Sequence, residues 1–536
     1  MTAAVFDAAV VGGGHNGLVC AAYLAGAGLR VCVLERRGIV GGAAVTEAFH
    51  PGFRNSTASY TVGLLHPKVV RDLALASQGL RIVERPMANF LPLSDRAGDA
   101  LAIGGGLAAT QAAIGRHSRR DAERWPLYQA MLARVAAVVN DLRLATPPDA
   151  GGGAAALLAA WRATRRFRAL DRAARRDALD LFTKSAGDLL DRWFESAPVK
   201  AALAFDAIVG HYASPYAGGS AYLLLHLVAG GVDGKPGAWG HAIGGMGAIT
   251  QAMARTCAAR GVAIRTDAEV ARVLVKAGRA AGVELASGEV VEARRVVANV
   301  NPKLLFRRLV APEHVPDDFR ARIDGYRCAS GTFRMNVALA ALPSFAARPG
   351  PGPHLASGIV MAPSLAYMER AYLDARTRGW SQAPVVEMLI PSLVDDTLCA
   401  PGSHVASLFC QHVHPDLGEV LPGRTWDDAR DEVADLMIGT VERFAPGFRR
   451  AVVGRSALTP LDLERDFGLV GGDIYHGAMT ADQLFCARPV PGYAGYRMPL
   501  RGLYLCGAGA HPGGGVSGVP GHNAAREILR DVRRHG

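Results

Sequence analysis

The sequence lacks the features that hold small secreted or metal-dependent proteins together. Its eight cysteines contain no Cys-x-x-Cys pair and stand far apart, at positions 20, 32, 257, 328, 399, 410, 486 and 506. Isolated cysteines in mostly apolar segments are typical of reduced core residues in an intracellular protein. The His-Glu-x-x-His, P-loop and Gly-x-Ser-x-Gly patterns are also absent. The sequence therefore carries none of the usual markers of zinc hydrolases, P-loop hydrolases or serine hydrolases. We predict no metal site.

Long apolar runs are missing as well. No stretch reaches the roughly 18 apolar residues that a membrane-spanning helix needs. A glycine motif begins within a dozen residues of Met1, so we expect no signal or transit peptide and a cytoplasmic location. The chain has 536 residues and 63 glycines, which is enough for two or three lobes with a buried core.

What the sequence does contain is a nucleotide-binding pattern close to its start. An apolar run at residues 8–11 predicts a strand, and Gly12-x-Gly14-x-x-Gly17 leads from it into a helical stretch. In such a turn Gly12 permits the sharp bend and Gly14 leaves room for a pyrophosphate. Gly17 lets helix and strand pack closely, while the helix N-terminus presents free N–H groups. We therefore predict dinucleotide binding.

The residues after the next predicted strand narrow the choice of dinucleotide. Glu35 ends the apolar run 31–34, where a carboxylate accepts hydrogen bonds from a ribose hydroxyl. Arg36 and Arg37 could suggest a 2′-phosphate, but Glu35 would repel it, which favours NAD or FAD over NADP. A second glycine turn, Gly41-Gly42, follows. A plain NAD domain does not need this turn.

The third part of the pattern lies near the other end of the chain. Residues 502–509 predict a short buried strand that breaks into a glycine turn at Gly507. A glycine-rich loop follows, and it includes His511, Gly514 and Val516. Such a backbone can lie flat against a planar ring, and the helix predicted after Pro520 directs its positive dipole toward the loop. We interpret this loop as the flavin-binding wall.

These motifs resemble those of the phytoene desaturase-related flavoproteins. The resemblance is strongest to the branch called pyridine nucleotide-disulfide oxidoreductase domain-containing protein 2, and it covers residues 12–18, 41–47, 51–53, 58–60, 244–247 and 471–520. The wider superfamily usually has an arginine after the Gly-Gly pair, whereas this sequence has Ala43. No close cysteine pair supports the disulfide chemistry in the branch name.

The resemblance implies an α/β fold with a discontinuous Rossmann-type FAD domain, like that of glutathione reductase and the amine oxidases, and a mixed α+β substrate lobe. It implies FAD as cofactor and adds Gly247 and Val270 to the cofactor-binding candidates, with Val270 near the adenine. The expected FAD domain comprises residues 1–75, 240–305 and 465–536. The helix-rich segment 76–239 and the mixed segment 306–464 are expected to form the substrate lobe.

Catalytic residues are harder to predict because the flavin itself performs the electron chemistry. The polar candidates near the expected cofactor are His211, Tyr212 and His476, since histidine exchanges protons near neutral pH. A structural role is the simpler alternative for each of them.

The favoured function is an FAD-dependent oxidoreductase that desaturates or oxidises an apolar, polyene-like or an amine-bearing small molecule by hydride transfer to flavin N5. Two alternatives stay open. One is a redox-neutral isomerase that uses reduced flavin, and the other is a flavin-bound regulatory or partner-binding protein. The sequence does not identify the substrate or the electron acceptor.

The net charge of +11 is concentrated in one segment. Between Trp161 and Arg176 seven arginines face a single aspartate, with aromatic and aliphatic residues between them. One interpretation is a helix that docks on an anionic membrane at its inner face. The alternative is a solvated helix face. No nucleic-acid module accompanies the charge, so we predict no nucleic-acid partner.

Overall fold

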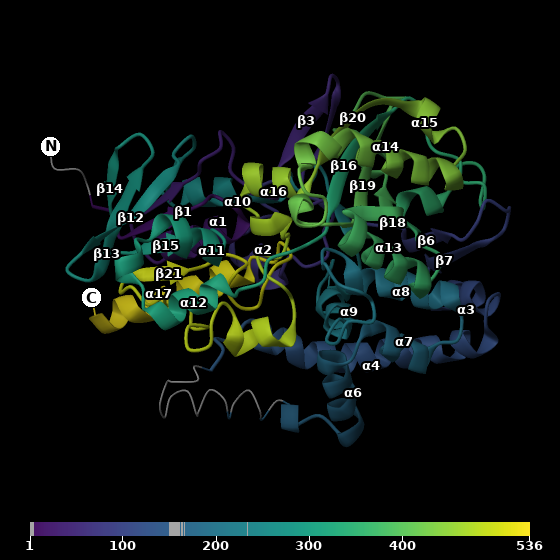
Figure 1. Cartoon of the computed structure of the whole chain (residues 1–536). Coiled ribbons are helices and arrows are strands. Elements are labelled where there is room, and N and C mark those ends of the chain that lie inside the picture. Colours follow the sequence, from purple (N-terminus) through teal and green to yellow (C-terminus); the bar gives the residue numbers. More distant parts are fainter. Residues whose placement is uncertain (1–4, 149–160, 162–164, 166, 233, 536) are drawn as a thin grey trace.

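A computed structural model describes residues 5–148, 161, 165, 167–232, 234–535 of the chain (Figure 1). Gly151 to Gly153, together with Arg162 and Arg166 of the arginine-rich segment, lie outside the described residues. Membrane docking through residues 162–176 therefore stays a prediction. Among the described residues, no helix has the length and apolar character needed to cross a membrane.

A five-stranded parallel sheet forms one end of the molecule (Figure 1). Four of its strands are buried apolar runs, as expected for a parallel sheet with both faces covered, and the edge strand of residues 263–265 is partly exposed. Helices α1 (His15–Gly26), α10 (Gly247–Ala259) and α17 (Val519–His535) pack together beside it. The strand order is β11 (Ala263–Arg265), β2 (Val31–Leu34), β1 (Ala8–Val11), β15 (Val296–Ala298) and β21 (Leu503–Leu505).

A smaller antiparallel sheet belongs to the same end of the molecule. It contains β12 (Val270–Lys276), β13 (Arg279–Leu285) and β14 (Val290–Glu292). Short elements extend this end: α2 (Pro67–Asp72), α11 (Pro302–Leu304) and α12 (Asp317–Asp324), and the paired strands β3 (Thr46–His50) and β4 (Phe53–Ser56). Strand β5 (Ile82–Glu84) pairs with β10 (Gly240–Ala242), and β8 (Gly231–Val232) pairs with β9 (Lys235–Pro236).

The second large sheet has seven strands and combines two distant parts of the chain. Its order is β20 (Val452–Leu458), β16 (Phe333–Leu339), β19 (His404–Val413), β18 (Trp380–Leu389), β17 (Gly358–Met361), β6 (Met87–Pro92) and β7 (Ala100–Gly104). All neighbours are antiparallel except β17 and β6. The segment 76–239, predicted as helix-rich, thus also supplies two strands to this sheet.

Helices surround this second sheet. Helices α13 (Leu365–Arg378) and α14 (Trp426–Phe444) pack on β18, and α16 (Pro460–Phe467) follows β20. A helical layer lies below the sheet in Figure 1 and consists of α3 (Leu107–Gly115), α4 (Arg119–Arg143), α6 (Arg172–Thr183), α7 (Ala186–Trp193), α8 (Ala197–Ile208) and α9 (Ala221–Val228). The predicted fold class, a Rossmann-type sheet with a mixed α+β lobe, is confirmed.

Candidate functional site

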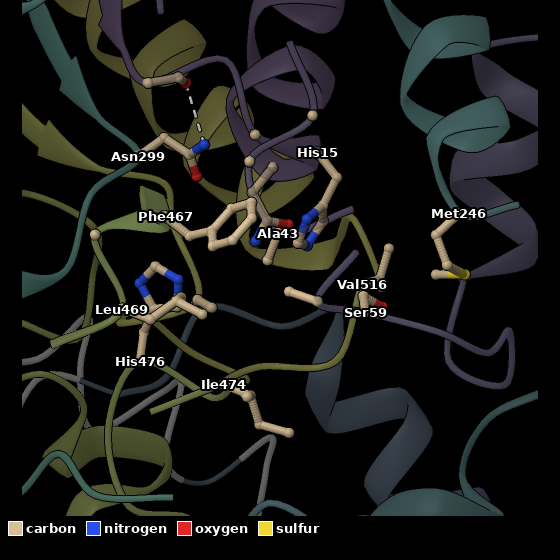
Figure 2. A pocket seen from close by; sticks show the side chains of 18 of the residues that line it. His15, Ala43, Ser59, Met246, Asn299, Phe467, Leu469, Ile474, His476 and Val516 are labelled. Carbon is tan, nitrogen blue, oxygen red and sulfur yellow. Dashed lines mark hydrogen bonds between the residues drawn. The ribbon is translucent and has the colours of Figure 1, made fainter. Parts of the chain in front are cut away.

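A cavity of about 300 Å³ lies at the carboxyl ends of the parallel strands, where this sheet meets the seven-stranded sheet. Ligands of open α/β sheets bind at this edge. One end of the cavity is polar and glycine-rich, with Gly12, Gly14 and Glu35 in its wall. The other end is largely apolar, and its wall includes Leu64, Leu65, Leu227, Trp239, Phe409 and Ile474. Figure 2 shows part of this lining.

The two N-terminal glycine turns lie against each other in the wall. Gly41 donates its N–H to the Gly13 carbonyl at 2.9 Å, and a Cβ added at Gly42 would lie 3.2 Å from the Gly14 Cα. Gly12 has a φ of +95°, which glycine adopts without strain. The backbone can therefore approach a ligand closely at this point, as a pyrophosphate requires.

Gly17 does not line the cavity, and its role is in the packing of helix α1 against the first glycine turn. A Cβ at this position would overlap the carbonyl oxygen of Gly12. Helix α1 begins just before it and has no capping side chain, and the Oδ1 atom of Asn16 has no hydrogen-bond partner among the described residues. The first N–H groups of α1 are thus available to an anion, in agreement with the phosphate-binding role expected of a helix N-terminus.

Glu35 is held in place by the backbone around it. The Gly13 N–H donates to Glu35 Oε2 at 2.8 Å, and the Arg37 N–H donates to Oε1 at 3.0 Å. Each carboxylate oxygen retains a further lone pair for a ribose hydroxyl. Val270 lies in the same part of the cavity wall. Arg37 is paired with Glu47 at 2.8 Å, so its charge is already compensated.

Some of the remaining cofactor-binding candidates line the cavity, and the others lie behind its wall. Val516 lines the cavity together with Gly515 and Ala508, whereas Gly247, Gly507, His511 and Gly514 do not. His511 Nε2 lies 3.0 Å from the Leu142 carbonyl, and Gly247 donates its N–H to Thr46 Oγ1 at 2.9 Å. A Cβ at Gly514 would lie 2.6 Å from the Tyr475 Cα. These residues position the wall from behind.

Two buried guanidinium groups lie behind the glycine-rich loop. Arg488 donates to the carbonyls of Tyr475 and Ala508 at 2.7 and 2.9 Å. Arg143 is 2% exposed, and its Nε and Nη2 atoms have no partner among the described residues. Burial and the charge of Arg143 lower the pKa of His226, which lies beside Gly515, to about 3. Because neither arginine has an ion pair within the described chain, an anionic group at the loop would be stabilised.

His476 and His15 face the cavity from opposite elements (Figure 2). His476 has a φ of +58°, and its Nδ1 atom has no hydrogen-bond partner in the described structure. Burial lowers its pKa to about 4, while burial and the neighbouring His476 lower the pKa of His15 to about 3. Both rings are therefore neutral at pH 7. His15 was not predicted as a site residue, although it lies inside the first glycine motif.

His211 and Tyr212, the other catalytic candidates, lie outside the cavity wall. Burial lowers the pKa of His211 to about 4, and its Nδ1 atom has no partner among the described residues. Tyr212 packs against Tyr372, His412 and His414, with ring centroids 5.4, 6.2 and 5.6 Å away. His476 and His15 thus line the cavity, whereas His211 and Tyr212 do not, and the catalytic roles expected of His476, His211 and Tyr212 stay predictions.

Sequence reasoning also missed a buried polar cluster beside the apolar end of the cavity. Tyr60, which lines the cavity, donates its hydroxyl to Glu387 Oε2 at 2.5 Å and stacks on Phe409. Arg85 donates to Thr61 Oγ1. Burial raises the pKa of Glu387, and burial together with Glu387 raises the pKa of Asp206 to about 7. The sequence signal for this cluster is a glutamate, Glu387, inside the otherwise apolar run 385–390.

No group of three or more metal-ligating side chains occurs within the ranges that the structure describes.

Comparisons with known proteins fit this geometry. A family model described as flavin containing amine oxidoreductase matches residues 17–333. The chain is 42% identical to pyridine nucleotide-disulfide oxidoreductase domain-containing protein 2 of Rattus norvegicus, over 98% of this chain and 94% of that protein. It is 25% identical to the lycopene-forming phytoene desaturase of Pseudescherichia vulneris, over 95% and 96% of the two chains.

Among solved structures, cyclohexylamine oxidase from Brevibacterium oxydans has a TM-score of 0.54 at 17% identity, and the match covers 99% of this chain and 100% of that one. At this identity the match shows a shared fold. The family resemblance predicted from the glycine motifs is confirmed by the matched family model and the rat relative. The chain therefore belongs to the flavin-containing amine oxidoreductase family, among the phytoene desaturase-related members that include pyridine nucleotide-disulfide oxidoreductase domain-containing protein 2.

Proposed function

We propose that the chain binds FAD in this cavity and oxidises or desaturates a largely apolar small molecule. The observation that carries the proposal is the meeting of two glycine turns, the uncapped start of α1 and Glu35 along one wall. Gly12, Gly14, Gly41 and Gly42 would hold the pyrophosphate, and Glu35 would hold the adenosine ribose. Val516 and the adjoining loop would face the flavin.

The bound flavin would supply the acceptor for a hydride from substrate. The chain would supply position and a dry environment. Leu64, Leu227 and Trp239 belong to the apolar end of the cavity, where they would exclude water and favour an apolar substrate. The phytoene desaturase activity named for the Pseudescherichia vulneris relative supports the same substrate class.

The neutral histidines fit a hydrogen-bonding role. With a pKa of about 4, His476 is a weak proton acceptor at pH 7, so it would orient a polar atom of cofactor or substrate more readily than it would remove a proton. Arg143 and Arg488 would stabilise negative charge that develops on the flavin side of the loop.

Cofactor content tests the first part of this proposal. The purified protein should carry FAD and absorb near roughly 450 nm. Gly14→Val should abolish FAD binding, because the added side chain would meet Asn299 and the pyrophosphate path. Glu35→Ala should weaken it by about 1–3 kcal/mol, the usual cost of losing a charged hydrogen-bond partner. Gly218→Ala, at an open exposed position, serves as control. Colourless protein that rejects added FAD would contradict the assignment.

Anaerobic bleaching tests the reaction. The FAD-loaded protein should be reduced by members of a panel of polyenes and apolar amines, measured as loss of flavin absorbance. Isomerisation of a polyene by prereduced protein, without any electron acceptor, would instead favour the isomerase alternative. Bound FAD that no panel member reduces would favour a partner-binding role.

A further inference from the structure

A second cleft, of about 380 Å³, lies at the opposite edge of the parallel sheet. The FAD-type cavity is at the carboxyl ends of the strands, whereas this cleft is lined by residues that directly precede β15 and β21. It also takes residues from the start of β13 and from α17. The lining residues that carry charge are Arg279, Arg295, Arg497, Arg501 and Asp531.

The charges in this arginine cleft do not balance. Arg497 donates from Nε and Nη2 to the two oxygens of Asp531, both at 2.8 Å, and Tyr504 donates to Asp531 at 2.8 Å. That carboxylate is therefore engaged by Arg497. Arg279, Arg295 and Arg501 have no carboxylate within ion-pair distance among the described residues. Three guanidinium groups thus share one small cleft without an ion pair to any carboxylate in the part of the chain that the structure describes.

The backbone holds these arginines close together. Arg279 and Arg501 form an isolated β-bridge, and the Ala280 N–H donates to the Arg501 carbonyl at 2.8 Å. Arg295 accepts the Ala9 N–H at 3.0 Å through its own carbonyl. Because backbone hydrogen bonds and pairing fix all three positions, the three residues line the same cleft although their charges repel. A concave surface concentrates the resulting positive potential.

We propose that the arginine cleft binds a small soluble anion with at least two phosphate groups. Guanidinium groups match phosphate oxygens in bidentate geometry, and such charge-assisted hydrogen bonds are stronger than neutral ones. The cleft volume lies within the range of about 300–1,000 Å³ that is usual for small-molecule sites. The anion would supply the negative charge that the cleft lacks. This site is separate from the proposed FAD cavity, since the two lie at opposite edges of one sheet.

Inorganic pyrophosphate is the probe for this site. Isothermal titration calorimetry would be performed on protein saturated with FAD, so that the glycine-turn cavity is filled. We expect saturable binding that weakens as salt concentration rises. Arg295→Gln/Arg501→Gln should bind pyrophosphate at least tenfold more weakly. Arg322→Gln/Arg378→Gln is the matched control, because it removes two exposed arginines from α12 and α13 and changes the net charge equally.

Four outcomes would overturn the proposal. They are no binding by the wild-type protein at millimolar pyrophosphate, equal weakening in both double variants, loss of binding in Gly14→Val, and binding only to phosphatidic acid vesicles. Gly14→Val also separates this proposal from the FAD assignment: it retains all four cleft arginines, so it should bind pyrophosphate even though it is expected to lose FAD.

Discussion

At the scale of single residues, the least expected feature is a pair of carboxyl groups beside the apolar end of the cavity, of which Glu387 is buried and Asp206 is partly buried. Glu387 projects from the seven-stranded sheet and Asp206 from α8, and Arg85 interacts with both. Tyr60 connects this cluster to the cavity through its hydrogen bond to Glu387. The apolar end of the site thus borders on a carboxyl group, that of Asp206, whose pKa of about 7 lies near neutral pH.

Asp206 should make stability depend on pH in an unusual direction. Its pKa is about 7 in the folded chain, mainly because of burial, against 3.8 when unconstrained. Below pH 4 the group is protonated in both states and has no effect. As the pH rises from 4 to 7 only the unfolded state loses the proton, so stability falls. Asp206→Asn should therefore raise the free energy of unfolding at pH 8 by about 2–4 kcal/mol and leave it unchanged near pH 4.

Thermal unfolding at several pH values measures this effect. Asp318→Asn, at an exposed position on α12, is the control and should follow the wild-type curve throughout. An Asp206→Asn melting temperature that runs parallel to the wild type from pH 4 to 8 would show that Asp206 does not hold its proton.

The position of a residue in the fold follows from sequence where one short motif dictates the local geometry. Gly12, Gly14 and Glu35 line the cavity because strand, turn and helix are consecutive in the chain. Asp206 and Glu387 were missed because about 180 residues separate them, and only the tertiary fold brings them together. The site assignments themselves stay predictions until the cofactor is measured.

At the scale of elements, the contact between β1 and α1 is the tightest part of the nucleotide-binding pattern. Gly17 lies in the first turn of α1, and any side chain there would overlap the Gly12 carbonyl. We expect Gly17→Ala to destabilise the protein by about 1–3 kcal/mol, the usual cost of overpacking, and to lower its FAD affinity. Gly115→Ala, at the end of α3 with its nearest atom 3.8 Å away, should have little effect. Equal melting temperatures for the two variants would contradict this prediction.

The boundaries of a helix or strand follow from the sequence where a local signal, such as a helix cap, marks its end. Helix α14 (Trp426–Phe444) begins at a position that the sequence marks, since Thr425 and Asp428 form a capping box there. Strand β18 begins at Trp380, five residues before the apolar run 385–390, because its pairing with β19 extends to Val413 through an irregular register. Neither this pairing nor the addition of β6 and β7 to the same sheet has a local sequence signal.

At the scale of the whole molecule, buried neutral histidines should make the protein sensitive to mild acid. Burial lowers the pKa to about 3 or 4 for His15, His66, His211, His226, His354, His412, His476 and His511. In the unfolded chain each takes up a proton near pH 6.5. Stability is therefore complete above pH 6.5 and is lost as the pH falls toward 4. Two such residues already lower the free energy of unfolding at pH 5 by about 4 kcal/mol relative to neutral pH.

Melting temperatures at constant ionic strength should fall steeply between pH 7 and pH 5. His354→Phe is an informative variant because the ring of His354 is buried, packs edge-on against Phe90 and has no hydrogen-bonded nitrogen among the described residues. This variant should be less acid-sensitive than the wild type. A melting temperature that stays constant over this range would show that the histidines are accessible to protons.

The order of strands in the parallel sheet also has a consequence for biosynthesis. Strands β1 and β2 carry the first glycine turn and Glu35, yet β15 joins them only after some 260 further residues, and β21 with the Gly515–Val516 wall comes near the end of the sequence. A nascent chain on the ribosome therefore exposes half of the proposed nucleotide site for most of its synthesis. Under the proposed function, cofactor capture would wait for residues 503–516, so the availability of flavin should affect the yield of mature protein without affecting its translation.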